Sequence, residues 1–208
     1  GFTVAFFQAA DTNGAWTNSS SQVTIGMGSL GTLKVNNIAG AAGNGIDDVM
    51  PAAYNETWDG LALTSDNPSF FGSSTASGSV TYSIPAQEMM GLTVNASVDY
   101  DPAADVAATA AGGVNATNRT GTAFVLKLDH ESGLSLGAGT EEIDNGGTKT
   151  ATSTGSDEKN VTAYAKFAAG PVSVGYQEAY NNNANGAADN EADFWAIAYS
   201  AGDFSVSY

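Results

Sequence analysis

The chain has 208 residues, no cysteine and one histidine, and its 22 acidic residues against 6 basic ones give a formal net charge of −16. Disulfide bonds, cysteine-ligated metals and thiol catalysis are therefore excluded, and so acidic a surface repels nucleic acid and attracts cations. Only 13% of the residues are charged, whereas soluble domains usually contain about a quarter. The mean hydropathy of −0.11 is close to zero. Such a value fits a structure in which apolar residues on one face and polar residues on the other nearly cancel in the average.

Alternation of apolar and polar residues begins at the first residues and recurs along the chain. It is clearest at residues 91–100, which read GLTVNASVDY. A period of two predicts β-strands, because successive side chains of a strand point to opposite faces. About eleven strands are expected on this pattern. They lie at residues 2–10, 22–28, 32–38, 79–84, 91–100, 122–129, 134–142, 161–168, 172–180, 194–199 and 204–208.

The connections between these segments are alternately very short and long. We expect long polar loops at residues 11–21, 101–121, 143–160 and 181–191, with tight turns between them. No apolar run approaches the roughly 18 residues that a membrane helix needs. Alternating strands joined in this way are typical of a transmembrane antiparallel β-barrel, with apolar side chains toward lipid and polar ones toward water. The sequence thus predicts one all-β barrel domain over residues 1–208.

Residues 39–78 interrupt the pattern. They form a stretch of about forty residues without a sustained period of two, and loops of such length are usually functional or disordered. Tyr54, Trp58, Leu61 and Phe70 give this stretch more apolar surface than simple disorder allows. We therefore expect it to pack against another part of the protein.

Aromatic residues near strand ends offer a second indication. Barrels of this kind carry aromatic girdles at both membrane interfaces, although strands in general are rich in aromatic residues. The expected girdle residues are Tyr100, Tyr180, Phe194, Trp195, Tyr199 and Tyr208.

Three short motifs carry a resemblance to a known family. Residues 28–36 read GSLGTLKVN and precede the long interruption, while residues 165–176 read AKFAAGPVSVGY and residues 199–208 read YSAGDFSVSY. The first resembles the strand pair before the third loop of general bacterial porins, and the other two are similar to turns of α-proteobacterial members. The third-loop motif of that family is only partly matched, by PAAYNE at 51–56 and WDG at 58–60.

The resemblance implies a trimeric, 16-stranded channel of the bacterial outer membrane. Membrane lipid, lipopolysaccharide and small hydrophilic solutes would be its partners, with no nucleic acid. Residues 39–78 would be the third loop, folded into the lumen as a constriction. The family's loop order would place the chain between about the third and thirteenth strands. Because open sheet edges are not tolerated in lipid and bacterial barrels have even strand numbers, we expect a fragment of a larger barrel.

Charged residues are the candidates for controlling passage. The interrupting stretch contains acidic residues and neither lysine nor arginine, and three lysines face the lumen by strand parity. Acidic clusters favour cations in channels, although acids in a loop also serve simply to solvate it. The expected constriction residues are Asp47, Asp48, Glu56, Asp59, Asp66, Lys34, Lys127 and Lys166.

Calcium is a second interpretation of the same acids. Asp47, Asp48, Glu56 and Asp59 offer the oxygen ligands that Ca²⁺ prefers, but no twelve-residue calcium-loop motif is present. No other cofactor is expected.

A soluble or secreted β-sandwich, acting as an adhesin or a shell-type interaction protein, is the alternative to a channel. A sandwich also alternates, but its apolar face would form a dry core and should hold larger residues. Many of the apolar positions here are alanine. An enzyme is not expected, because His130 has no serine and aspartate partners at a recognisable spacing.

Overall fold

The computed structural model describes residues 1–10, 16–37, 46, 49–53, 79–102, 120–144, 157–182 and 189–208. Within these ranges the chain forms twelve strands and one short 3-10 turn, η1 (Gly28–Leu30). The strands are β1 (Phe2–Ala10), β2 (Trp16–Gly26), β3 (Thr32–Asn37), β4 (Val80–Ser83), β5 (Gln87–Met89), β6 (Leu92–Asp101), β7 (Thr120–His130), β8 (Leu134–Asp144), β9 (Glu158–Ala169), β10 (Val172–Asn182), β11 (Asn190–Ala201) and β12 (Phe204–Ser207). No helix within them is long and apolar enough to cross a bilayer.

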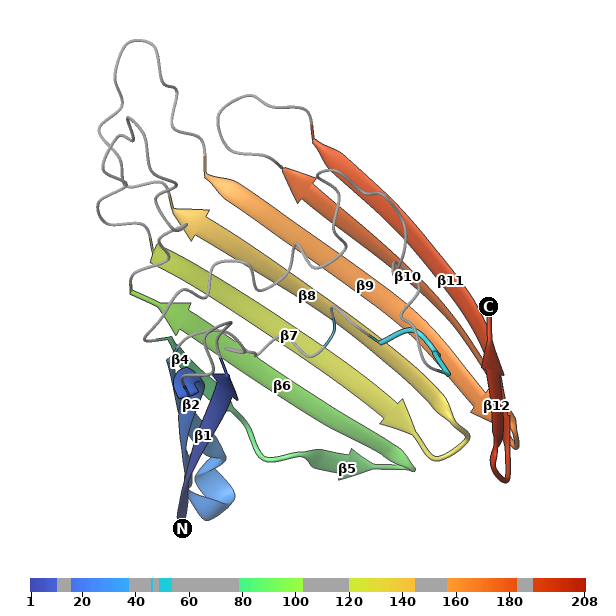
Figure 1. Cartoon of the computed structure of the whole chain (residues 1–208), viewed down its shortest axis with the longest axis horizontal. Helices are drawn as coiled ribbons and strands as arrows, with labels where there is room; N and C mark the ends of the chain where they lie inside the picture. The colour runs from blue at the N-terminus through green and yellow to red at the C-terminus, as the bar shows by residue number, and fades with distance from the viewer. Residues whose placement is uncertain are drawn as a thin grey trace.

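All strands belong to one curved antiparallel sheet (Figure 1). The order is β1-β2-β3-β4-β6-β7-β8-β9-β10-β11-β12, and β5 pairs with β6 off this path. In the described residues β1 and β12 each pair on one side only, so the sheet is open. The predicted all-β architecture of consecutive antiparallel strands is confirmed.

The eleven predicted strands correspond to the eleven strands along this path, and two expectations about connections were wrong. Residues 85–91 were expected to be a turn, but β5 pairs there with the start of β6. Residues 16–21 were expected to lie in a loop, but β2 begins at Trp16 and pairs with β1 up to the Trp16–Ala10 pair. Backbone hydrogen bonding continues past the alternating segment because it does not depend on the side chains being apolar.

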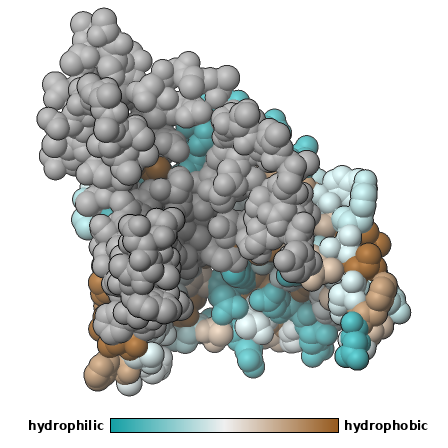
Figure 2. Space-filling view, viewed as in Figure 1, coloured by the Kyte–Doolittle hydropathy of each residue, from teal (hydrophilic) through white to brown (hydrophobic). Residues whose placement is uncertain are grey.

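The two faces of the sheet have opposite character. Large apolar side chains on one face, which we call the outer face, are exposed. They include Val4, Ile25, Val98, Phe124, Leu136, Phe167, Val174, Trp195 and Ile197. Figure 2 shows hydrophobic residues along the left and right margins of the molecule and hydrophilic ones at the lower centre of the viewed face.

The opposite face, which we call the inner face, buries polar side chains. They are Asn36, Ser79, Thr81, Asp99, Asp101, Glu141, Asn160, Thr162, Gln177 and Asn181. Apolar side chains outside and polar ones inside are the reverse of a water-soluble globule, and they are the arrangement expected of a barrel wall in lipid.

The residues expected in an aromatic girdle lie on the outer face except Phe194, and their place at a membrane interface stays a prediction. Tyr100, Tyr180, Trp195, Tyr199 and Tyr208 are exposed, whereas Phe194 is buried on the inner face with 7% of its surface accessible. Strand parity explains the difference, because Trp195 points outward and its neighbour Phe194 must point inward.

The short connections lie at one end of the sheet, which we call the turn end, and the long ones at the other, the loop end. At the turn between β7 and β8, Gly133 has a φ of 92°. A Cβ at this position would collide with the carbonyl oxygen of Ala168. Only glycine therefore suits both the backbone and the close approach of β9.

Candidate functional site

The acidic residues predicted from the sequence lie outside the described part of the chain. These are Asp47, Asp48, Glu56, Asp59 and Asp66. Their role in a constriction and the binding of calcium by four of them stay predictions. Among the described residues no group of three or more histidine or acidic side chains is placed to hold a metal ion.

The three predicted lysines lie on the inner face by strand register. Lys34 is opposite Thr24 and Thr81. Lys127 is opposite Asn95 and Gly137, and Lys166 is opposite Ser135 and Gly175. All three thus face the side of the sheet that buries polar residues, and their part in a constriction stays a prediction.

A segment of the long interruption crosses this inner face. In Figure 1 it is drawn in cyan, in front of β8 to β10. The Gln177 Nε2 donates a hydrogen bond to the carbonyl oxygen of Ile46 at 2.7 Å. Farther along, the amide nitrogen of Ala53 donates to the Ser207 Oγ at 2.9 Å. These residues therefore extend from β10 to β12. We call them the crossing segment (residue 46 and residues 49–53).

Apolar contacts hold the crossing segment against the sheet. Ile46 and Met50 are 0% and 7% exposed. They form a buried cluster with Ala123, Val125, Tyr164, Phe194 and Ala196. Burying a side chain such as Ile or Met stabilises a structure by about 1.5–3 kcal/mol. The sequence-based expectation that the interruption packs against another part of the protein is thus met at these residues.

Gly175 of β10 lies directly beneath the crossing segment. A Cβ added there would lie 2.8 Å from the Pro51 Cδ and 2.9 Å from the Met50 Sδ. Real side chains do not approach so closely. The absence of a side chain at this position therefore lets the segment lie flat against the strand.

Polar networks line the inner face on both sides of this contact. Across β2, β3 and β4, the Gln22 Nε2 donates to the Asn36 Oδ1 at 2.7 Å. The Asn36 Nδ2 in turn donates to the Thr81 Oγ1 at 3.0 Å and to the Ser79 Oγ at 3.3 Å. These bonds satisfy polar groups that would otherwise be costly to bury.

A second network joins β8, β9 and β10 toward the loop end. The Asn181 Nδ2 donates to the Asn160 Oδ1, and the Asn160 Nδ2 donates to the Glu141 Oε2 at 2.9 Å. The Gln177 Nε2 also donates to the Thr162 Oγ1 at 3.1 Å, in addition to its bond with the crossing segment. The Gln177 amide thus bonds both with the neighbouring strand and with the crossing segment.

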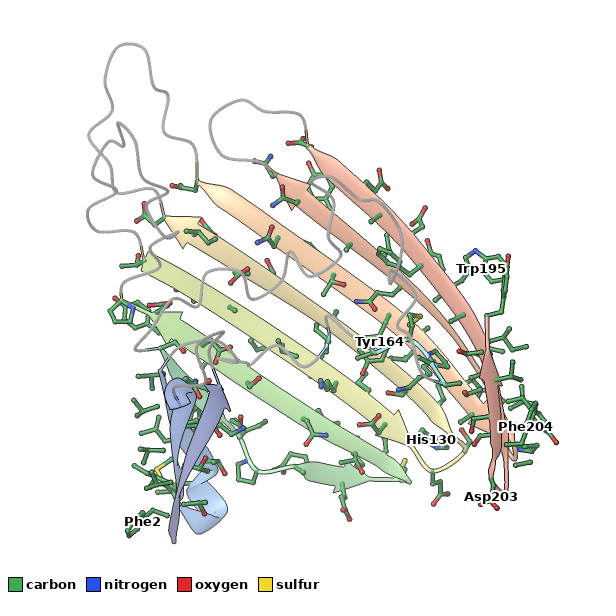
Figure 3. The ribbon with its side chains drawn as sticks, viewed as in Figure 1. Phe2, His130, Tyr164, Trp195, Asp203 and Phe204 are labelled. Atoms are coloured by element: carbon green, nitrogen blue, oxygen red, sulfur yellow. The ribbon has the colours of Figure 1, made fainter. Side chains whose placement is uncertain are left out.

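Tyr164 connects the apolar cluster to a third polar group near the turn end. Its hydroxyl lies 3.3 Å from the Ser135 Oγ, which donates to the Asp129 Oδ1 at 2.6 Å. The Tyr164 ring lies over Gly137, where any Cβ would collide with it. Figure 3 shows Tyr164 over the middle of the sheet, whereas Phe2, Trp195 and Phe204 point away at its margins.

The inner face carries charges of both signs. Besides the three lysines, register places several acids of the described strands on it. They include Glu88, Asp99, Asp101, Asp129 and Glu141. The inner face is therefore polar and of mixed charge.

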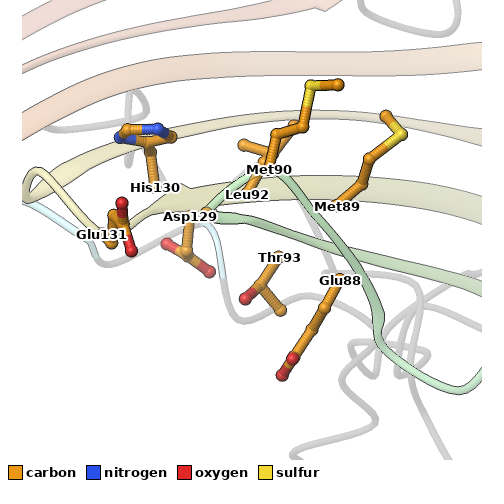
Figure 4. Close-up of a pocket in the computed structure, with 9 residues that line it drawn as sticks. Glu88, Met89, Met90, Leu92, Thr93, Asp129, His130 and Glu131 are labelled. Carbon is orange, nitrogen blue, oxygen red and sulfur yellow. The ribbon is translucent and has the colours of Figure 1, made fainter.

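A cavity of about 540 Å³ opens at the turn end, between β5, β6 and β7 (Figure 4). The figure shows His130 and Met90 on one side of the strands and Asp129 and Glu88 on the other. The His130 Nδ1 lies 2.8 Å from the Ser132 Oγ, within its own turn. Because the polar groups do not converge, this cavity does not form a catalytic site.

The sequence analysis missed Gly175, Gln177, Tyr164 and Ser207. Their role depends on a segment more than a hundred residues away in the chain, which alternation cannot reveal. One local signal was available: Gly137, Gly139 and Gly175 stand at inward positions of alternating strands. Glycine inside a strand often marks a close approach of other atoms.

Comparison with known proteins gives one family. The family model described as Gram-negative porin matches residues 1–208. No curated protein matches the chain. The family match agrees with the resemblance carried by the three motifs, and it does not distinguish the α-proteobacterial members.

Proposed function

Because the chain belongs to the Gram-negative porin family and hence to the bacterial outer membrane, we propose that it forms a passive diffusion channel for small hydrophilic solutes and ions, with a preference for cations. One observation carries the proposal. The sheet exposes its apolar rows and buries its polar ones, and a segment of the long interruption lies on the polar side. A wall of this polarity separates lipid from water.

The constriction is proposed to consist of residues 39–78. Asp47, Asp48, Glu56, Asp59 and Asp66 would face Lys34, with Lys127 and Lys166 farther along the wall. The contacts of Ile46, Met50 and Ala53 with β10 and β12 support an inward course for this stretch. Acids concentrated at the narrowest point would raise the local cation concentration.

The family also supports the proposed surroundings of the channel. Membrane lipid and lipopolysaccharide would contact the outer face, and the protein would assemble as a homotrimer, as is usual for porins. No observation favours the β-sandwich alternative, in which the apolar rows would meet each other in a dry interior. Here Trp195 and Ile197 are 66% and 45% exposed.

Planar bilayer recordings under a KCl gradient test the proposal. The wild-type protein should conduct, and its reversal potential should have the sign of a cation-preferring channel. The variant Asp47→Asn, Asp48→Asn, Glu56→Gln, Asp59→Asn should move the reversal potential toward zero, because it removes four negative charges from the proposed constriction.

A matched control removes four acids from the outer face instead. These are Glu178, Asp189, Glu191 and Asp193, all exposed beside the loop end of β10 and β11. Neutralising them should leave the reversal potential almost unchanged. Absence of conductance in the wild type would end the channel proposal, and an equal shift in both variants would exclude the four constriction acids as the filter.

A further inference from the structure

The geometry points to Gly175 as the residue that positions the constriction. Because it has no side chain, it leaves space on the channel wall for Met50 and Pro51, and we call this contact the seat. The inference rests on the proposed channel function and goes beyond it, because it concerns what sets the width of the passage rather than what selects the ion.

Space, and not backbone conformation, explains glycine at this position. Gly175 lies within β10 and is not among the glycines with positive φ. It pairs with Lys166 of β9 and Ala196 of β11 in the regular register. A glycine inside a strand weakens the strand. Any other residue at this position would instead occupy the volume that the Pro51 ring and the Met50 thioether fill.

The seat lies between two polar attachments of the same segment. The Ile46 carbonyl accepts from Gln177, two residues along β10 from Gly175, and the Ala53 amide donates to Ser207 of β12. Met50 and Pro51 fall between these attachments and are both buried. The Met50 thioether can turn aside, but the Pro51 ring is fixed to the backbone, so with its two ends held the segment accommodates a new side chain at position 175 by moving away from the wall.

The crossing segment is held by β10 and β12, whereas Lys34, Asn36 and Thr81 lie on β3 and β4 near the other end of the sheet. In the proposed channel, solutes pass between the segment and that far wall. To regain an ordinary carbon–carbon contact of about 3.5–4.0 Å, the segment would have to withdraw by on the order of 1 Å into this passage.

Single-channel conductance of the full-length protein tests the inference. Gly175→Ala should lower the conductance, and Gly175→Val should lower it further, because the larger side chain moves the segment farther from the wall. Gly26→Ala is the matched control. Gly26 also lies in an inward row of a strand, but the nearest atom to its added Cβ is the Gly1 carbonyl oxygen at 3.6 Å. This control should conduct as the wild type does.

A second pair of substitutions separates positioning from misfolding. Met50→Ala and Pro51→Ala together remove the atoms that an added Cβ would meet, so adding Gly175→Ala to this pair should leave the conductance of the pair unchanged. A variant that merely misfolds would not be rescued in this way. Conductance of Gly175→Ala and Gly175→Val equal to that of the wild type would overturn the inference, and so would a loss that the Met50→Ala, Pro51→Ala background leaves unchanged. Failure of the wild type to conduct would instead remove the channel proposal itself.

Discussion

At the scale of single residues, inward glycines act by making room for larger neighbours. Gly137 of β8 pairs with Tyr164 of β9, and the tyrosine ring lies across the space above the glycine. The ring thereby reaches the hydroxyl of Ser135 and at the same time contacts the apolar cluster under the crossing segment. One missing side chain allows one aromatic ring to connect the polar and the apolar parts of the inner face.

Gly137→Ala should therefore destabilise the protein by about 1–3 kcal/mol, the usual cost of overpacking. The added methyl group would force the Tyr164 ring out of its position. Urea unfolding in detergent micelles measures the effect. Gly137→Ala in a Tyr164→Ala background should show no such additional loss, and a full loss in that background would refute the proposed ring contact.

The polar network of β2 to β4 predicts a comparable effect at Asn36. This residue is 3% exposed and bonds with Gln22, Ser79 and Thr81. Asn36→Leu should lower the free energy of unfolding by about 1–3 kcal/mol, because it leaves buried partners unsatisfied. Adding Gln22→Leu should recover part of this loss. If the double variant is less stable than the sum of the single variants predicts, the network argument is wrong.

The face of the sheet that a residue occupies was largely predictable from the sequence. The segments that pack on that face were not. Parity assigned Lys34, Lys127 and Lys166 to the inner face because a strand alternates strictly. It could not show that the Gln177 amide bonds with the Ile46 carbonyl, since that contact joins residues far apart in the chain. Phe194 was misassigned because its nearness to a strand end was considered without its parity.

At the scale of elements, β10 and β11 mark where the apolar band ends. Their outward pairs Val174–Ile197 and Tyr176–Trp195 are apolar, while the next pair toward the loop end is Glu178–Asp193. The Tyr176 hydroxyl crosses this boundary and donates to the Asp193 Oδ1 at 2.9 Å. A tyrosine with its ring in the band and its hydroxyl on a carboxylate is typical of a membrane interface.

A lysine introduced on either side of this boundary should have different effects. Ile197→Lys should cost about 2–4 kcal/mol if its position is near the bilayer midplane, whereas Asp193→Lys should cost about 0–1 kcal/mol. Reversible unfolding from lipid vesicles measures both. Equal costs for the two variants would mean that the Tyr176–Trp195 pair does not mark the edge of the hydrocarbon.

The number and order of the strands on the main path were predictable from the sequence, but the lengths of the strands were not. Alternation identified the eleven strands of the main path, because one face must be apolar in lipid. It stopped short in β11, which begins at Asn190 although its first residues read NEAD. Beyond the apolar band, outward and inward side chains are both polar, so alternation no longer identifies the strand. Backbone pairing continues there. The three-residue β5 carries too few residues to show a period.

At the scale of the whole molecule, the proposed cation preference is consistent with the formal charge of −16. Screening limits the effect, since the Debye length is about 30 Å at 0.01 M salt and about 3 Å at 1 M. At a fixed concentration ratio, the reversal potential should therefore be larger in dilute than in concentrated KCl. Reversal potentials that do not change with ionic strength would indicate selection by size or by close coordination instead.

The exposed apolar rows also govern how the protein reaches its final location. A folded sheet with apolar rows on its outer face is stable only when hydrocarbon covers these rows. In water, two copies would bury their rows against each other. Insertion into the bilayer must therefore be faster than self-association. The rate of self-association depends on the protein concentration, whereas the rate of insertion depends on the available lipid. Refolding by dilution into preformed vesicles should give a yield that falls as protein concentration rises and climbs as vesicles are added.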